Sequence, residues 1–235
     1  MKILLPRLKQ TAVLLFFFLL ITPVNSVFGQ KLQWAITGNI LYFPADNGVD
    51  ADPAPIIPSL GGALSLPLVG VLRIELTEDI YITNYEFNPV LGYPTASNPE
   101  NRSALVIGFI TAFQVTGNFS IGDKGTVIRA YAGPAADLRI VTLAAGLNHP
   151  SDLTGDIKTN AQLQTEAIRD YFWSDARWFM PVVGFGMDFP INEKFLLGFD
   201  LRTWFPVYKT WTDKDLPAIN GWRFGVGFRI TPRSN

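Results

Sequence analysis

The sequence predicts an all-β fold: an eight-stranded antiparallel up-and-down transmembrane barrel with a short helix in the longest outer loop. Three observations lead to this prediction. Apolar and polar residues alternate with a period of two over most of the chain after residue 30, the expected strands are even in number, and long connections alternate with short ones. A barrel of this kind crosses a bilayer because it closes on itself and leaves no strand edge in lipid.

The composition agrees with a chain that tolerates apolar surface. Charged residues make up 17% of the 235 residues and hydrophobic residues 48%, whereas soluble domains carry about 25% charged residues. The formal net charge is −1 with no basic block, so nucleic acid is not an expected partner. Cysteine is absent and histidine occurs once, so neither a metal site nor another cofactor is expected.

The first 29 residues have the three-part pattern of a secretory signal peptide. Lys2, Arg7 and Lys9 form a positive start, an apolar run follows over residues 11–21, and small residues end the segment at Gly29. The apolar run is too short to span the hydrocarbon layer comfortably as a helix. We therefore expect residues 1–29 to be a cleavable signal peptide and residues 30–235 to be the barrel domain; an uncleaved anchor is the alternative.

The eight expected strands are separated by three short turns and four long loops. The short turns fall at Thr77-Glu78-Asp79, at residues 122–125 and at residues 190–193. In the longest loop, apolar residues recur three and four positions apart over residues 159–177, which predicts a helix that caps the barrel mouth; a lid over a ligand site and an interfacial helix are the alternatives. The strands are expected at about residues 33–43, 60–75, 80–91, 103–121, 126–143, 178–189, 194–208 and 222–230.

One face of the strands combines glycine with arginine and carboxylates, and the other is bulky and apolar. Arginine forms directed bonds to carboxylates, so this mixture suits an enclosed network of pairs better than a solvated surface. Eight strands leave an interior just wide enough for side chains to fill. A soluble barrel or sandwich with its apolar face inside is the alternative. The residues expected to pair in the lumen are Arg73, Glu75, Glu86, Arg129, Asp137, Arg139, Asp188, Asp200, Arg202, Arg223 and Arg229.

Aromatic residues stand near both ends of the expected strands. Such rings favour the interface between lipid and water, where they form two girdles around membrane barrels. The residues expected in these girdles are Trp34, Tyr42, Tyr81, Trp178, Trp204 and Trp222.

The hairpin over residues 183–202 is similar to hairpins of small bacterial outer-membrane barrels of the OmpA, OmpX and OmpW kind. The similarity is to the class and includes no motif of a single family. It implies the outer membrane of a diderm bacterium as the location. It also implies outer-membrane lipid and the barrel assembly machinery as partners.

Three functions are compatible with these features. The first is a structural or surface-interaction barrel, whose outer loops bind a partner. The second is a narrow pore, or a conduit for small apolar molecules as in the OmpW-like class. The third is a lipid-modifying hydrolase, because His149-Pro150-Ser151 resembles the His-x-Ser of outer-membrane lipid A deacylases, which would make His149 and Ser151 catalytic. A histidine without a catalytic role in a loop is the alternative to the third.

Overall fold

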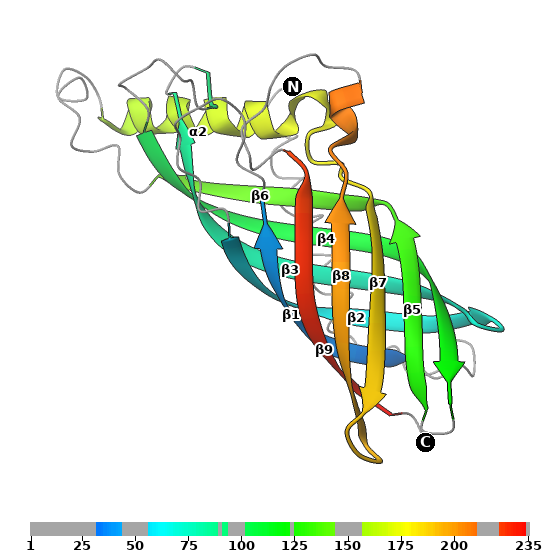
Figure 1. Cartoon of the computed structure of the whole chain (residues 1–235). Coiled ribbons are helices and arrows are strands. Elements are labelled where there is room, and N and C mark those ends of the chain that lie inside the picture. The colour runs from blue at the N-terminus through cyan, green and yellow to red at the C-terminus, as the bar shows by residue number, and fades with distance from the viewer. Residues whose placement is uncertain are drawn as a thin grey trace. The chain divides into compact units, whose positions relative to one another are not determined.

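The chain forms a closed antiparallel barrel, seen from the side in Figure 1. This computed structural model describes residues 32–43, 56–88, 91–93, 102–122, 125–143, 157–210 and 221–233. Its strands are β1 (Gln33–Tyr42), β2 (Ile56–Val69), β3 (Leu72–Phe87), β4 (Arg102–Ile121), β5 (Thr126–Gly133), β6 (Ala135–Leu143), β7 (Val182–Pro190), β8 (Phe195–Trp204) and β9 (Arg223–Pro232).

Antiparallel pairings run around the whole sheet, in which β4 pairs with both β5 and β6, and β5 pairs with β7. β1 pairs with β9 as well as with β2, and β3 pairs with β4 along its whole length. Among the described strands, each except β6 therefore lies between two others, and β6 pairs with β4 and has an isolated bridge from Ala136 to Phe179. This closure is what allows a sheet to stand in hydrocarbon.

β5 and β6 together occupy one position in the barrel. Their partners on β4 keep a single register, Val115 with Ala132 and then Ala112 with Ala135. The interruption falls at Pro134, which has no N–H to give to the ladder. Counted by position, the barrel has eight strands, as the sequence predicted.

The connections confirm the predicted alternation of short and long links, but one turn was placed wrongly. The first short turn is at Gly70 and Val71, where Gly70 has a φ of +56°, a conformation that glycine adopts without strain. Thr77-Glu78-Asp79, expected to be this turn, instead lies within β3. Three consecutive polar residues interrupt the alternation of apolar and polar side chains, and such an interruption predicts a turn between two separate strands.

The two faces of the barrel are oriented as a membrane barrel requires. Phe199, Phe224 and Phe228 are 54%, 40% and 49% exposed on the outer surface. Arg202 and Arg223 are 4% and 0% exposed, inside the cylinder. A soluble barrel would have the reverse arrangement, so the fold is a membrane β-barrel.

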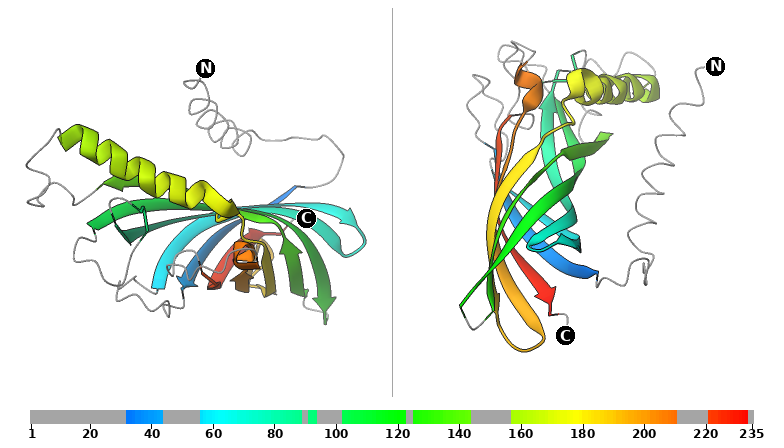
Figure 2. Two further views of the ribbon diagram at one scale, coloured as in Figure 1. Left: turned by 90° about the horizontal axis from the view of Figure 1, so that it is seen from above. Right: turned by 90° about the vertical axis from the view of Figure 1, so that its right-hand side faces the viewer.

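Helix α2 (Ile157–Trp173) and the short 3₁₀ helix η3 (Ser174–Ala176) confirm the helix predicted in the longest loop. Figures 1 and 2 show α2 at the end of the barrel opposite to the β7–β8 turn. The buried residues Ile168, Tyr171 and Phe172 join the apolar cluster inside this end. A second 3₁₀ helix, η4 (Val207–Thr210), follows β8 and contributes the buried Tyr208.

Two predictions concern residues outside the described part of the chain: the signal peptide over residues 1–29, and the pair His149 and Ser151. Within the described ranges, no helix combines the length and the apolar character needed to cross a bilayer.

Candidate functional site: the charged lumen

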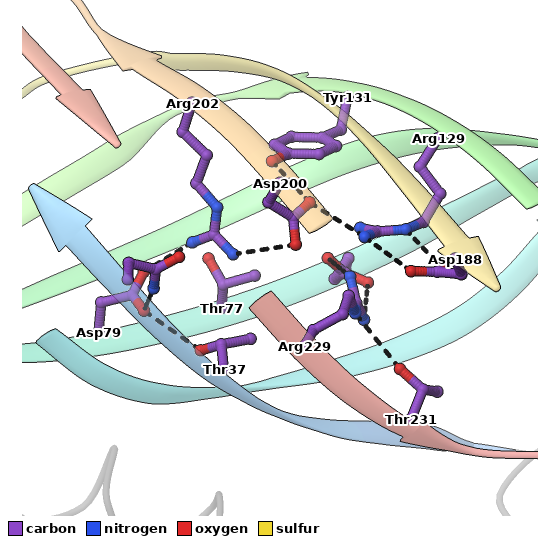
Figure 3. A network of polar contacts seen from close by, with 12 residues as sticks. Thr37, Thr77, Asp79, Arg129, Tyr131, Asp188, Asp200, Arg202, Arg229 and Thr231 are labelled. Carbon is purple, nitrogen blue, oxygen red and sulfur yellow. Dashed lines mark hydrogen bonds and ion pairs between the residues drawn. The ribbon is translucent and has the colours of Figure 1, made fainter. Parts of the chain in front are cut away.

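Two bidentate ion pairs lie toward the end of the barrel that carries the short turns. Arg129 holds Asp188 through Nε and Nη2, at 2.8 and 3.0 Å from the two carboxylate oxygens, and its Nη2 also lies 3.0 Å from Oδ1 of Asp200. Arg229 holds Glu75 through both terminal nitrogens, at 3.2 and 3.0 Å. Arg129 and Asp188 join the paired strands β5 and β7, whereas Arg229 and Glu75 join β9 and β3, which are not paired, so this second contact ties the wall together across the lumen. Figure 3 shows this part of the network.

A second group of contacts lies around Asp79 and Arg202. Nη1 of Arg202 lies 2.7 Å from Oδ2 of Asp79. The other oxygen of Asp79 accepts hydrogen bonds from Asn39 at 2.6 Å and from Thr37 at 3.3 Å. Asp200 connects this group to the first, because it accepts from Tyr131 at 3.1 Å while it faces both Arg129 and Arg202.

Asp137 is the centre of a third group, nearer the end that α2 covers. Its carboxylate accepts from Arg139 at 2.6 Å, from Arg223 at 2.8 Å and from the Tyr81 hydroxyl at 3.0 Å. The Arg223 guanidinium also lies 4.6 Å from the centre of the Phe43 ring. Two arginines against one carboxylate are thus stabilised partly by aromatic faces.

The three groups fill the interior with charges that neutralise one another. The five acids, Glu75, Asp79, Asp137, Asp188 and Asp200, and the five arginines, Arg129, Arg139, Arg202, Arg223 and Arg229, are each at most 7% exposed. Removing one partner of such a pair leaves the other as an uncompensated buried charge, which is far more costly than losing both. The network therefore specifies how the strands face one another, as well as excluding solvent from the lumen.

An aromatic layer covers the third group. Phe172 of α2 packs 4.9 Å from Tyr85 and lies 4.7 Å from the Arg139 guanidinium. Next to it, Tyr171 packs 4.9 Å from Tyr93 and lies under the Arg177 guanidinium at 4.2 Å. The helix thus closes the end of the barrel with side chains that contact the charged network directly.

The structure places most of the eleven residues expected in the lumen inside it. Arg73 also faces inward, close to the Gly70 turn, where it is half-buried and donates to Ser65 Oγ at 2.7 Å. The buried members are Glu75, Arg129, Asp137, Arg139, Asp188, Asp200, Arg202, Arg223 and Arg229.

Glu86 was assigned to the wrong face. It lies on the outward side of β3 together with Asn84 and Ile82, while Tyr85 and Phe87 point inward. The misplaced turn caused this error. In the continuous strand β3, every second residue after Glu75 faces inward, which places Tyr85 and Phe87 inside and Glu86 outside.

The girdle prediction needs two corrections. Trp34, Tyr42 and Trp222 are about half exposed on the outer surface, and Trp178 packs beside Trp173 at a centroid distance of 6.2 Å. Tyr81 and Trp204, in contrast, are both 1% exposed inside the barrel. Tyr81 belongs to the Asp137 group, and Trp204 follows Asp200 and Arg202 on the same inward face of β8.

Asp79, Tyr131, Asn39 and Thr37 take part in the network but were not among the predicted residues. Asp79 was hidden by its assignment to a turn. Its position two and four residues from Thr77 and Glu75 would have indicated the inward face, had β3 been read as one strand. Within the described residues, no cluster of three or more potential metal ligands is present.

Comparisons with known proteins give likeness of shape only. No protein-family model matches the chain, and no curated protein matches it. Among solved structures, Neisserial surface protein A is similar over 88% of this chain and 100% of its own, with 8% identity and a TM-score of 0.47. Ail, the attachment invasion locus protein of Yersinia pestis, solved with the heparin analogue sucrose octasulfate, matches over 87% and 97% with 8% identity and a TM-score of 0.33.

CarO of Acinetobacter baumannii matches over 85% of this chain and 97% of its own, with 7% identity and a TM-score of 0.23. At these values the likeness carries no argument about function. The assignment as a membrane β-barrel rests on the closed strand pairing and on the apolar outer face of this chain.

Proposed function

We infer that the chain is an outer-membrane protein with a structural or surface-interaction role, exported by its signal peptide and inserted by the barrel assembly machinery. The observation that supports this function best is the filled lumen. Paired and buried charges occupy it from Glu75 and Arg229 up to Asp137 and Arg223. A barrel whose interior is occupied by its own side chains offers its loops and outer wall, rather than a channel, for interaction.

The charge network also bears on the alternative of a narrow pore. Water and ions pass through a barrel along a solvated path, and the inward residues of all three groups are almost fully buried. Opening such a path would separate at least one bidentate pair, at a cost of several kcal/mol. A conduit for small apolar molecules, and a hydrolase that uses His149 and Ser151, stay predictions that this network does not address.

Planar bilayers test the proposal. The full chain is purified from an outer-membrane fraction, its folded state is checked by heat-modifiable migration on a gel, and its conductance is recorded beside a general porin that proves the bilayers report channels. We expect no conductance steps. Reproducible steps from the folded protein would favour the pore and contradict a structural role, and recovery of the protein in the soluble periplasmic fraction would contradict the location.

A further inference from the structure

Glu78 lies in an unusual place for a charged residue. It is on the outward face of β3, between Leu76 and Ile80, and it is half-buried there. Among the strand residues that the structure describes, Glu86 is the other charged residue on this face, and it stands beside the end of β3. Glu78 is therefore a carboxyl group within the lipid-facing part of the wall.

The neighbours of Glu78 across the strands are small. Its partner on β2 is Gly62, its partner on β4 is Thr111, and Thr111 is in turn paired with Ala136 on β6. Larger outward side chains surround this row, including Leu60 at 65% exposed and Phe113 at 52%. This row of small outward residues between larger ones, named the depression for its small side chains, carries a hydrogen bond from Thr111 Oγ1 to Glu78 Oε2, 2.5 Å long.

The depression lies within the apolar span of the wall. The same row of paired residues reaches β1 at Ile36, which stands between the exposed rings of Trp34 and Tyr42. Acyl chains can neither donate nor accept hydrogen bonds, so a carboxyl group costs free energy at this level. Thr111 is the hydrogen-bond partner that the described residues supply, and it engages one of the two carboxyl oxygens.

We propose that this depression is the contact surface between two copies of the chain in the membrane. A two-fold contact is isologous, so each copy presents the same patch to the other. Within each copy the Thr111 hydroxyl donates to Glu78 Oε2. A protonated Glu78 can therefore donate from its other oxygen to an oxygen of Thr111 or Glu78 of the second copy, and the second copy does the same in return across the axis. The small Gly62 and Ala136 let the two walls approach closely, as small residues do at contacts between membrane helices.

A lipid with an amine headgroup fits the depression less well. Its ammonium group stays at the interface with water, whereas Glu78 is flanked along β3 and across to β1 by apolar residues. A second copy delivers its polar groups at the depth of Glu78 by symmetry. The depression therefore fits a second copy of the chain better than it fits an aminolipid.

Cross-linking at single cysteines tests this contact, because the natural chain has no cysteine. Leu60→Cys places a thiol beside the depression, and Leu201→Cys places one on β8, on another part of the wall, from a leucine that is similarly exposed. Both variants are reconstituted into lipid vesicles over a range of dilutions and treated with a membrane-permeant bifunctional thiol reagent. We expect Leu60→Cys to form cross-linked dimers up to a lipid-to-protein ratio at least ten-fold higher than the highest ratio at which Leu201→Cys does.

Glu78 is then changed in the Leu60→Cys background. Glu78→Leu should lower the dimer yield at least ten-fold, while Glu78→Gln, which keeps hydrogen-bonding groups, should retain most of it. Heat-modifiable migration of each variant shows that the barrel is folded, and resistance to urea should be equal or higher for Glu78→Leu because a polar group leaves the lipid-facing wall.

Equal cross-linking at the two positions, or a dimer yield that Glu78→Leu leaves unchanged, would overturn the proposal. So would a chain that stays monomeric at every dilution. If a monomeric chain instead retained phosphatidylethanolamine over phosphatidylcholine in a manner that depends on Glu78, the occupant would be an aminolipid and the dimer would be wrong.

Discussion

At the scale of single residues, the lumen shows why its face combines arginine with glycine. Arg129, Arg202 and Arg229 each reach a carboxylate on another strand, and the planar guanidinium can satisfy two oxygens at once, which a lysine cannot do. The glycines make room for large rings: a side-chain carbon on Gly108 would lie 2.0 Å from the Tyr81 ring, and one on Gly184 would lie 2.3 Å from that of Tyr131. The tyrosines so accommodated donate to Asp137 and Asp200.

Arg129 is the residue whose loss should be felt most in the lumen, because it neutralises both Asp188 and Asp200. Arg129→Ala leaves these two buried carboxylates without their shared cation. We expect the free energy of unfolding to fall by about 3–5 kcal/mol, measured by urea unfolding of the protein in lipid vesicles.

Arg73→Ala is the matched control for this prediction. Arg73 also faces inward, but it is half-buried and donates to Ser65, so its loss should cost about 1.5 kcal/mol or less. An equal loss of stability in the two variants would contradict the claim that the buried ion pairs of Arg129 stabilise the barrel more than the half-buried Arg73 does.

At the scale of the elements, β3 and β8 show how far the sequence predicts the structure. β8 was predicted well, because Asp200 and Arg202 alternate with Phe199 and Leu201 and neighbouring strands have the same pattern. β3 was not, because consecutive polar residues occur in a strand only when both of its faces accept them. Thr77 and Asp79 face a charged lumen, while Glu78 faces outward beside Thr111.

The contacts between strands set a second limit to prediction. Periodicity assigns Arg129, Asp188 and Asp200 to one face, but which arginine meets which acid depends on the register and tilt of strands far apart in the chain. The sequence indicated that the charges would pair inside the barrel. The division into three groups, and the roles of Tyr81 and Trp204 within the interior, came from the structure.

Of the α2 side chains that the structure describes, Ile168, Tyr171 and Phe172 pack into the apolar cluster of the barrel. Phe172→Ala removes the ring that contacts Tyr85 and Arg139. We expect amide hydrogens of residues 164–173 to exchange at least about ten-fold faster, since the local opening of a helix reports its docking energy. Amides of β8 and β9 should keep their protection.

Leu163→Ala is the control on the same helix, because Leu163 is 58% exposed. Its exchange should resemble that of the natural chain. Faster exchange throughout β8 and β9 in Phe172→Ala would instead mean that the helix and the barrel unfold as one unit.

At the scale of the whole molecule, the outer wall and the interior differ in their access to lipid, and tryptophan reports on both. The chain contains six tryptophans. Trp34 is exposed on the outer surface, whereas Trp204 is enclosed with the charged residues of β8. Trp34 therefore tests whether the apolar face of the wall contacts lipid, and Trp204 tests whether the charged face is shielded from it.

Variants that keep a single tryptophan, with phenylalanine at the other five positions, are folded into vesicles of lipids brominated along their acyl chains. Bromine quenches fluorescence at short range, so we expect strong quenching in the variant that keeps Trp34 and little in the one that keeps Trp204. A third variant, which keeps Trp222, should resemble the first, because Trp222 is exposed beside Phe224. Quenching of Trp204 as strong as that of Trp34 would place the charged face in lipid. Such a result is incompatible with a barrel whose arginines and carboxylates pair inside.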